Sequence, residues 1–167
     1  MDVRLRDVPE QRVVTEQATV DQAALGGWLP GAMSRVHETA GAARAETGEQ
    51  PWLLRDHVAG EPVFIVIYEG NPNEGPVLVE VCTPLRPQAA DPDGASARTI
   101  PAHREAYVRL PKNIVTSGRI GEAYAAVEHW AGEQNLQVAA APRETYWTDF
   151  MAAGPDDEVF DVAFPVR

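Results

Sequence analysis

The order strand, helix, strand, strand occurs twice along this chain, and the repetition constrains its fold more than any other feature. The two occurrences cover about residues 12–85 and 98–166, and they share a pattern of apolar spacing rather than residue identity. A single unit would leave its sheet face uncovered, whereas two units together bury both helices against one continuous sheet. We therefore predict an α+β fold of one domain, residues 1–167, in which the duplicated unit forms one antiparallel sheet with two helices on one side.

The first half opens with a β-branched strand over residues 12–20, followed by an amphipathic helix. Asp21 can cap this helix. Gly26, Gly27 and Pro30 weaken its first part, so a bend or a broken first turn is expected. The rest of this half is predicted to be a long polar loop at 47–61 and two strands within 61–70 and 76–85.

The second half follows residues 86–97, in which Pro, Asp, Gly and Ala occur without pattern and predict a linker. Thr116 or Ser117 can cap the helix of this half, and Asn135 suits the left-handed conformation that ends a helix. The buried stripe of this helix is predicted to be Ile120, Tyr124, Val127 and Ala131. Strands are predicted within 102–111, 141–150 and 159–166.

The charge of the chain excludes several classes of partner. The net charge is −11, the pI is about 4.7, and the sequence contains no basic stripe. Nucleic acids and anionic membrane surfaces are bound through clustered Lys and Arg, so we expect neither as a direct partner. The field of the protein attracts cations instead.

Most catalytic and cofactor signatures are absent. The sequence has no zinc motif, dinucleotide fingerprint, Walker loop or GxSxG elbow, and its four histidines are scattered, so we predict no metal and no cofactor. Cys82 is the only cysteine, and it fits a small buried hydrophobe better than a nucleophile. With no disulfide pair, no signal peptide and no apolar run of membrane-spanning length, the expected location is the cytoplasm.

An acid stands among aromatic residues in APRETYWTDF, residues 141–150. By strand alternation Glu144, Tyr146 and Phe150 share one face, with Trp147 next to them in sequence. A carboxylate beside this much aromatic surface either faces water or waits in a pocket for a positive group.

Acids also stand in apolar surroundings on other predicted strands, namely Glu80, Glu105 and Asp161. Glu105 shares a strand face with Tyr107 and Arg109. A concave sheet face lined by aromatic rings and one or two carboxylates suits a lipophilic cation, because the rings supply apolar area and cation–π attraction and the acid supplies the counter-charge.

The same pattern has a purely structural explanation. Glu144 can pair across strands with Arg109 or Arg143, or face solvent, since structural ion pairs resemble functional ones. Core or core-rim positions explain Tyr68, Tyr124 and Trp130 better than ligand contacts do, whereas both roles are equally supported for Trp28 and Trp147.

Seven stretches of the chain, in their order and spacing, resemble the GyrI-like small-molecule-binding domain: LGGWLPGAM, EPVFIVIYEG, VLVEVCTPL, IPAHREAYVRL, GEAYAAVEHWAGEQNL, APRETYWTD and FDVAFPV. This domain is also the effector-binding half of AraC- and MerR-type multidrug regulators. The resemblance covers nearly the whole chain and implies a duplicated fold with a central ligand groove. It leaves no residues for the helix-turn-helix half of those regulators, so a stand-alone domain is expected.

The resemblance also implies site residues. The buried glutamate of the family falls on Glu144, in the strand that matches RETYW. Pro111 and Lys112 replace the family's frequent glycine-rich turn, which predicts a different mouth of the groove. The aromatic candidates for stacking on a ligand are Trp28, Phe64, Tyr68, Tyr107, Tyr146 and Trp147.

Three functions stay open on these grounds. The first is a binding module that senses or sequesters a hydrophobic, cationic small molecule, as drug-resistance regulators do. The second is a hydrolase, since some stand-alone GyrI-like proteins open the strained cyclopropane of DNA-alkylating natural products; Glu144 would then activate water, and Tyr107 or Tyr146 would hydrogen-bond the substrate carbonyl. The third is a protein partner, such as a DNA-binding protein or gyrase.

Overall fold

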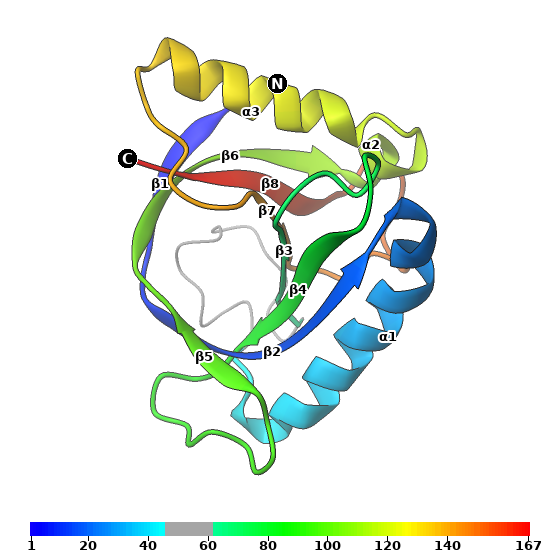
Figure 1. Cartoon of the computed structure of the whole chain (residues 1–167), viewed down its shortest axis with the longest axis vertical. Coiled ribbons are helices and arrows are strands. Elements are labelled where there is room, and N and C mark those ends of the chain that lie inside the picture. The colour runs from blue at the N-terminus through cyan, green and yellow to red at the C-terminus, as the bar shows by residue number, and fades with distance from the viewer. Residues whose placement is uncertain (46–61) are drawn as a thin grey trace.

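The computed structural model describes residues 1–45 and 62–167, which form one eight-stranded antiparallel sheet with helices packed on it (Figure 1). The predicted α+β class and single antiparallel sheet are confirmed. In chain order the elements are β1 (Arg4–Val8), β2 (Gln11–Val20), α1 (Gln22–Ala40), the 3₁₀ turn η1 (Gly41–Ala43), β3 (Phe64–Tyr68), β4 (Val77–Pro84), β5 (Ala97–Ile100), β6 (His103–Pro111), α2 (Lys112–Thr116), α3 (Ile120–Glu133), β7 (Arg143–Tyr146) and β8 (Glu158–Val166).

The strand order reflects the repeated pattern of the sequence. Across the sheet the strands run β1-β6-β8-β7-β3-β4-β2-β5, and every neighbouring pair is antiparallel. The central pair is β7 and β3. On one side of this pair lie β8 and then β6, and on the other side lie β4 and then β2. The two units, β2-α1-β3-β4 and β6-α3-β7-β8, therefore occupy corresponding places in the sheet.

The two long helices pack on the same face of the sheet. Val66 of β3 and Val162 of β8 both lie directly opposite Glu144 of β7 in the strand register, and residues paired in this way point to the same face. Val66 belongs to the apolar cluster beneath α1, and Val162 belongs to the cluster beneath α3. The predicted placement of two helices on one side is therefore confirmed.

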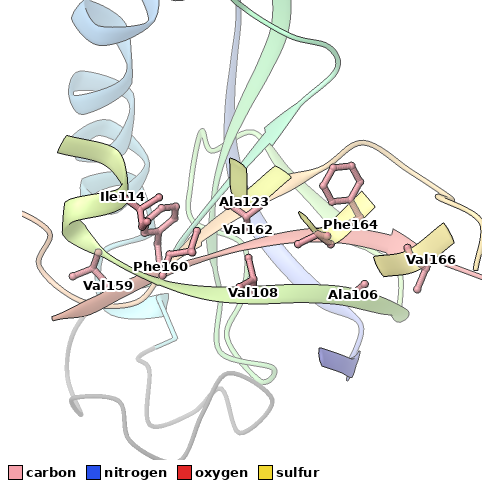
Figure 2. Packing of buried hydrophobic residues seen from close by; sticks show 12 residues of the cluster. Ala106, Val108, Ile114, Ala123, Val159, Phe160, Val162, Phe164 and Val166 are labelled. Atoms are coloured by element: carbon pink, nitrogen blue, oxygen red, sulfur yellow. The ribbon is translucent and has the colours of Figure 1, made fainter. Parts of the chain in front are cut away.

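Each long helix contributes small buried side chains to its own core. Figure 2 shows the core beneath α3, where Ala123 lies close to Val162 and the side chains of Phe160 and Phe164 extend from the same strand. The predicted stripe of this helix packs here, together with Ala123, which lies outside that stripe. The core beneath α1 is built in the same way, from Leu25, Ala32, Val36 and Ala40.

The N-terminal strand β1 is absent from the sequence-based prediction, and it extends the second half of the sheet. It pairs with β6, while β2 pairs with β5, and the register of one ladder continues unchanged into the other. Pro9 and Pro101 interrupt the ladder, because proline has no backbone N–H to donate. The β1–β2 and β5–β6 segments therefore form one long ribbon, which arcs along one side of the molecule and joins the two ends of the sheet (Figure 1).

The predictions for the first helix are partly confirmed. The Asp21 side chain accepts a 2.9 Å hydrogen bond from the backbone N–H of Ala24, as an N-cap does. The expected break is wrong, since α1 continues through Pro30 to Ala40. Four residues before Pro30 stands Gly26, which has open space around it and can absorb the clash of the proline ring with its carbonyl.

The predicted start of the second helix is wrong. Thr116 and Ser117 end the short helix α2, where the Ser117 hydroxyl donates to the Asn113 carbonyl at 2.6 Å. Helix α3 begins three residues after Ser117, preceded by Arg119, whose side chain makes no capping hydrogen bond. Its end is predicted correctly, since Asn135 has a φ of 57°.

One predicted strand is shorter than expected, and one predicted loop lies outside the described residues. The strand expected within 141–150 is short, because β7 ends at Tyr146 and Phe150 comes after it. The polar loop expected at 47–61 falls outside the described residues. In the part of the chain that the structure describes, no helix is both long enough and apolar enough to cross a membrane.

Candidate functional site

Glu144 occupies the centre of the sheet on the face that α1 and α3 cover. Its row in the strand register contains Val108 on β6, Val162 on β8, Val66 on β3 and Val81 on β4, each at most 2% exposed. Glu144 itself is 5% exposed. The row places one carboxylate among valines, which is an expensive position for a charge without hydrogen-bond donors.

Three tyrosine hydroxyls supply those donors. Tyr146, two residues further along β7, donates to Oε2 of Glu144 at 2.7 Å, and Tyr124 of α3 donates to Oε1 at 2.8 Å. Tyr68, the last residue of β3, donates to Oε2 at 3.2 Å. Glu144 is therefore held by hydroxyls from its own strand, from a neighbouring strand and from the helix above.

Burial and hydrogen bonding shift the pKa of Glu144 in opposite directions. Burial raises the pKa, the hydrogen bonds from Tyr146, Tyr124 and Tyr68 lower it, and burial dominates, so the pKa of Glu144 is raised. Burial and the nearby carboxylate both raise the pKa of each tyrosine, which keeps the phenols protonated as donors. The site therefore presents a carboxylate stabilised only by neutral groups.

Aromatic rings extend the site on both sides of Glu144. The Tyr146 ring stacks on Phe160 with centroids 5.2 Å apart and an interplanar angle of 11°, and it meets the edge of Phe150 at 6.2 Å. On the other side Phe64 lies opposite Tyr146 in the register, and Trp28 of α1 packs in the same cluster. These rings, except that of Phe160, are only partly buried, unlike the carboxylate.

The structure does not support the ion pairs considered for Glu144. Arg109 pairs with Asp161 instead, with 2.7 Å between Nε and Oδ1. Arg143 precedes Glu144 on β7 and therefore points to the opposite face. Among the described residues no cation forms an ion pair with Glu144, and only hydroxyls act on its pKa besides burial.

Two predicted site residues lie on the other face of the sheet. Tyr107 points away from α1 and α3, and its ring lies under the guanidinium of Arg6 at 4.0 Å. Trp147, at odd spacing from Glu144, has the guanidinium of Arg109 over its ring at 4.5 Å. The structure therefore gathers Trp28, Phe64, Tyr68 and Tyr146 on the side of Glu144, but not Tyr107 and Trp147.

Tyr124 is the residue that sequence reasoning assigned to the core and the structure places at the site. Its ring packs edge-on against Phe164 at 5.9 Å, as a core residue would, while its hydroxyl reaches Glu144. The available signal was a tyrosine on the apolar stripe of a helix, because a buried phenol requires a hydrogen-bond partner.

Metal or thiol chemistry finds no support at this site. In the described ranges 1–45 and 62–167 no three His, Cys, Asp or Glu side chains gather closely enough to hold a metal ion. Burial raises the pKa of the Cys82 thiol to about 12, and the side chain belongs to an apolar cluster on the opposite face. What the arrangement offers is a buried carboxyl group, proton-bearing phenols and apolar rings.

Structural comparison finds several solved structures with a similar fold. The C-terminal domain of EcmrR matches with a TM-score of 0.71 and 17% identity, over 99% of this chain and 97% of that chain. A hydrolase from Listeria innocua matches with a TM-score of 0.66 and 11% identity, over 99% and 92%. SAV2435 bound to tetraphenylphosphonium matches with a TM-score of 0.62 and 12% identity, over 100% and 94%. At such low sequence identities, the structural similarity shows only that these proteins share a fold with this chain.

Sequence comparison is more specific about the family. A search of curated proteins found no match. The family model of the GyrI-like small molecule binding domain matches residues 1–167, which is the whole sequence. The resemblance carried by the seven quoted stretches is thereby confirmed: the chain belongs to the GyrI-like small-molecule-binding family.

Proposed function

We propose that this protein binds a hydrophobic, cationic small molecule and that Glu144 is its counter-charge, in a sensing or sequestering role connected with drug resistance. The observation that carries the proposal is the buried Glu144 carboxylate, which has three phenol donors and no cationic partner among the described residues. Ionising a buried carboxylate is costly, and a bound cation would offset that cost. A cation of suitable shape therefore gains affinity that a neutral analogue does not.

The surrounding rings favour a ligand with a large apolar body. Tyr146, Phe64 and Trp28 are partly exposed aromatic residues on the side of the sheet that carries Glu144. Their faces attract a delocalised cation, and their area removes its apolar surface from water. The structure of SAV2435, whose bound tetraphenylphosphonium is a lipophilic cation, supports this choice of ligand class.

A thermal-shift screen of the purified protein tests the proposal. The panel would contain lipophilic cations, each matched to a neutral analogue of similar shape. A ligand present at about a hundred times its Kd stabilises the fold by about 2.7 kcal/mol, which is easily seen. We expect shifts with cations and smaller or absent shifts with their neutral partners; equal shifts within the pairs would count against a counter-charge.

A hydrolase is the second candidate. It is favoured by the short hydrogen bond between Tyr146 and Glu144, which puts a proton donor beside a base with a raised pKa. The Listeria innocua structure described as a hydrolase supports it. Glu144 would take a proton from water, the oxygen would bond to a cyclopropane carbon, and the electron pair of the broken C–C bond would pass to a conjugated carbonyl hydrogen-bonded by Tyr146. Tyr107, on the other face, is poorly placed for this role.

Turnover distinguishes the two candidates. If the protein is a hydrolase, a cyclopropane-containing electrophile is consumed catalytically by the wild type and not by Glu144→Gln, and oxygen from labelled water appears in the product. If the protein only binds, the compound is recovered unchanged. We keep the cytoplasm as the expected location and a protein partner as a further role; a native-lysate pull-down that recovers nothing would count against that partner.

A further inference from the structure

The face of the sheet turned away from α1 and α3 carries a buried network of charged side chains. Arg6 of β1 bridges two acids, with Nη2 at 2.6 Å from Oε1 of Glu105 and Nη1 at 2.5 Å from Oδ2 of Asp161. Arg109 also pairs with Asp161. Glu105 and Asp161 are at most 1% exposed, so these charges are fully removed from solvent.

A second pair lies across the sheet on the same face. Glu80 of β4 accepts from Nε of Arg98 at 2.7 Å and from the hydroxyl of Thr15 at 2.6 Å. Burial alone would raise the pKa of Glu80, but these hydrogen bonds and that from Gln17 lower it to about 2. Each of the buried carboxylates on the described part of this face thus lies within ion-pair distance of an arginine.

Arg143 differs from the other arginines of this face. Its side chain is 7% exposed, yet no carboxylate of the described residues lies within ion-pair distance. Its nearest described polar contacts are long, 3.5 Å to Nε2 of His103 and 3.5 Å to the carbonyl of Ala141, and its Nε has no acceptor among the residues that the structure describes. Burial lowers the pKa of Arg143 and outweighs the charges of Glu105 and Glu80, which raise it.

His103 cannot fully satisfy this guanidinium. Its Nδ1 is 2.8 Å from the carbonyl of Pro101 and therefore carries a proton. Its Nε2 lies 3.5 Å from Arg143 and 3.3 Å from Glu105. One nitrogen cannot accept from Arg143 and donate to Glu105 at the same time, so the described network is one acceptor short.

The charges of the face set the kind of acceptor that is needed. Each buried carboxylate on the described part of this face already pairs with Arg6, Arg98 or Arg109. Arg143 has no carboxylate within ion-pair distance among the described residues, so the acceptor that it lacks is expected to be an anion. A planar guanidinium matches the two oxygens of a carboxylate. We propose that this face binds a small organic carboxylate, a monoanion whose oxygens pair with Arg143.

The neighbours of Arg143 suit such an anion. Ile67 and Ala163 are its partners in the strand register, so apolar side chains flank the guanidinium. Ile67 belongs to a buried cluster with Cys82, against which Ala141 packs. Trp147, on the same face of the chain just after β7, has an indole N–H without an acceptor in the described ranges 1–45 and 62–167. The expected ligand therefore has a carboxylate and a short apolar body.

This site is independent of the proposed cation site. Arg143 and Glu144 are consecutive on β7, so they point to opposite faces of the sheet. The two sites also require opposite ligand charges. Each can consequently be removed by a substitution that leaves the other in place.

Calorimetric titration with sodium acetate and sodium benzoate, at constant ionic strength, tests the proposal. Benzamide serves as the neutral match for benzoate. We expect saturable one-site binding of benzoate, at least tenfold weaker binding of benzamide, and at least a tenfold loss of benzoate affinity in Arg143→Gln. The matched variant Glu144→Gln should keep benzoate affinity within twofold. Arg143→Lys, which keeps the charge and loses the fork, should fall between wild type and Arg143→Gln.

Several outcomes would overturn the carboxylate site. They are the absence of saturable binding for both acetate and benzoate, equal affinity for benzoate and benzamide, and unchanged benzoate affinity in Arg143→Gln. If that variant does not fold, the Nε resonance of Arg143 in the wild-type protein decides: it must shift with saturation on adding benzoate and stay unmoved on adding benzamide. Failure of the cation proposal would leave all of these readouts unchanged.

Discussion

The hydroxyl of Tyr124 on α3 donates to the carboxylate of Glu144 on β7 across 2.8 Å and ties the helix to the centre of the sheet. Tyr68 reaches the same carboxylate from β3, in the first half of the chain. The two halves therefore meet in hydrogen bonds to one acid as well as in apolar packing. Because all of these donors are neutral, none of them neutralises the charge of an ionised Glu144.

Removing the phenols one at a time should raise the pKa of Glu144 further. Each hydrogen bond favours the ionised form, and a bond to a charged group is worth enough to shift the pKa by about one unit. By bond length the effect should be largest for Tyr146→Phe, next for Tyr124→Phe and smallest for Tyr68→Phe. Carboxyl-carbon NMR titration of Glu144 measures it.

The control for this series is Tyr107→Phe, since Tyr107 lies on the other face of the sheet. It should leave the Glu144 titration unchanged. A series in which all four variants shift the titration equally would show that the tyrosines act through general packing and not through their hydroxyls.

The pH dependence of stability should carry the signature of a buried acid. With the pKa of Glu144 raised in the folded state above its ordinary value of 4.5, the folded protein binds more protons than the unfolded chain between these two values. The free energy of unfolding therefore falls as pH rises through this window, by at most about 1.4 kcal/mol per pH unit, and levels off above it.

Urea titrations of wild type and Glu144→Gln from pH 4 to 9 isolate this effect, because the other ionisable groups are common to both proteins. The difference in unfolding free energy should move in favour of the variant as pH rises. A difference that is constant with pH would mean that Glu144 has the same pKa in the folded and unfolded states.

Breaking the network on the opposite face should be costly. Asp161 is fully buried and accepts hydrogen bonds from both Arg6 and Arg109, so Asp161→Asn leaves buried positive charge uncompensated. We expect a loss of about 3–5 kcal/mol in chemical denaturation. Asp7→Asn is the matched control: its pair with Arg104, at 3.2 Å, is largely exposed, and its loss should cost less than about 1 kcal/mol. Similar losses in both variants would contradict this assignment of burial.

Local sequence pattern predicted the elements and the residues that share one face of a single strand. It did not predict which faces of different strands lie on the same side of the sheet. The position of Asp21 before an apolar repeat identified the first helix, and Asn135 identified the end of the second. Strand alternation placed Glu144 and Tyr146 on one face correctly. It could not relate that face to the face of Tyr107, because this relation depends on the pairing of β6, β8 and β7.

Two further features depend on contacts distant in sequence. Strand β1 is short and polar, and it becomes a strand by pairing with β6, about a hundred residues later. The role of Tyr124 depends on where α3 crosses β7, which helical periodicity does not determine. Periodicity gives the buried side of a helix, whereas the acceptor that a phenol reaches is set by packing.

The charge of Glu144 is proposed to determine which ligands bind. Paired calorimetric titrations test this most directly. Tetraphenylphosphonium and the neutral triphenylphosphine oxide would each be titrated into wild type and Glu144→Gln at pH 8. We expect the variant to bind the cation at least tenfold more weakly, a loss of about 1.4 kcal/mol or more, and to bind the neutral compound within twofold of wild type. An equal loss for both compounds, or undiminished binding of the cation, would contradict this proposal.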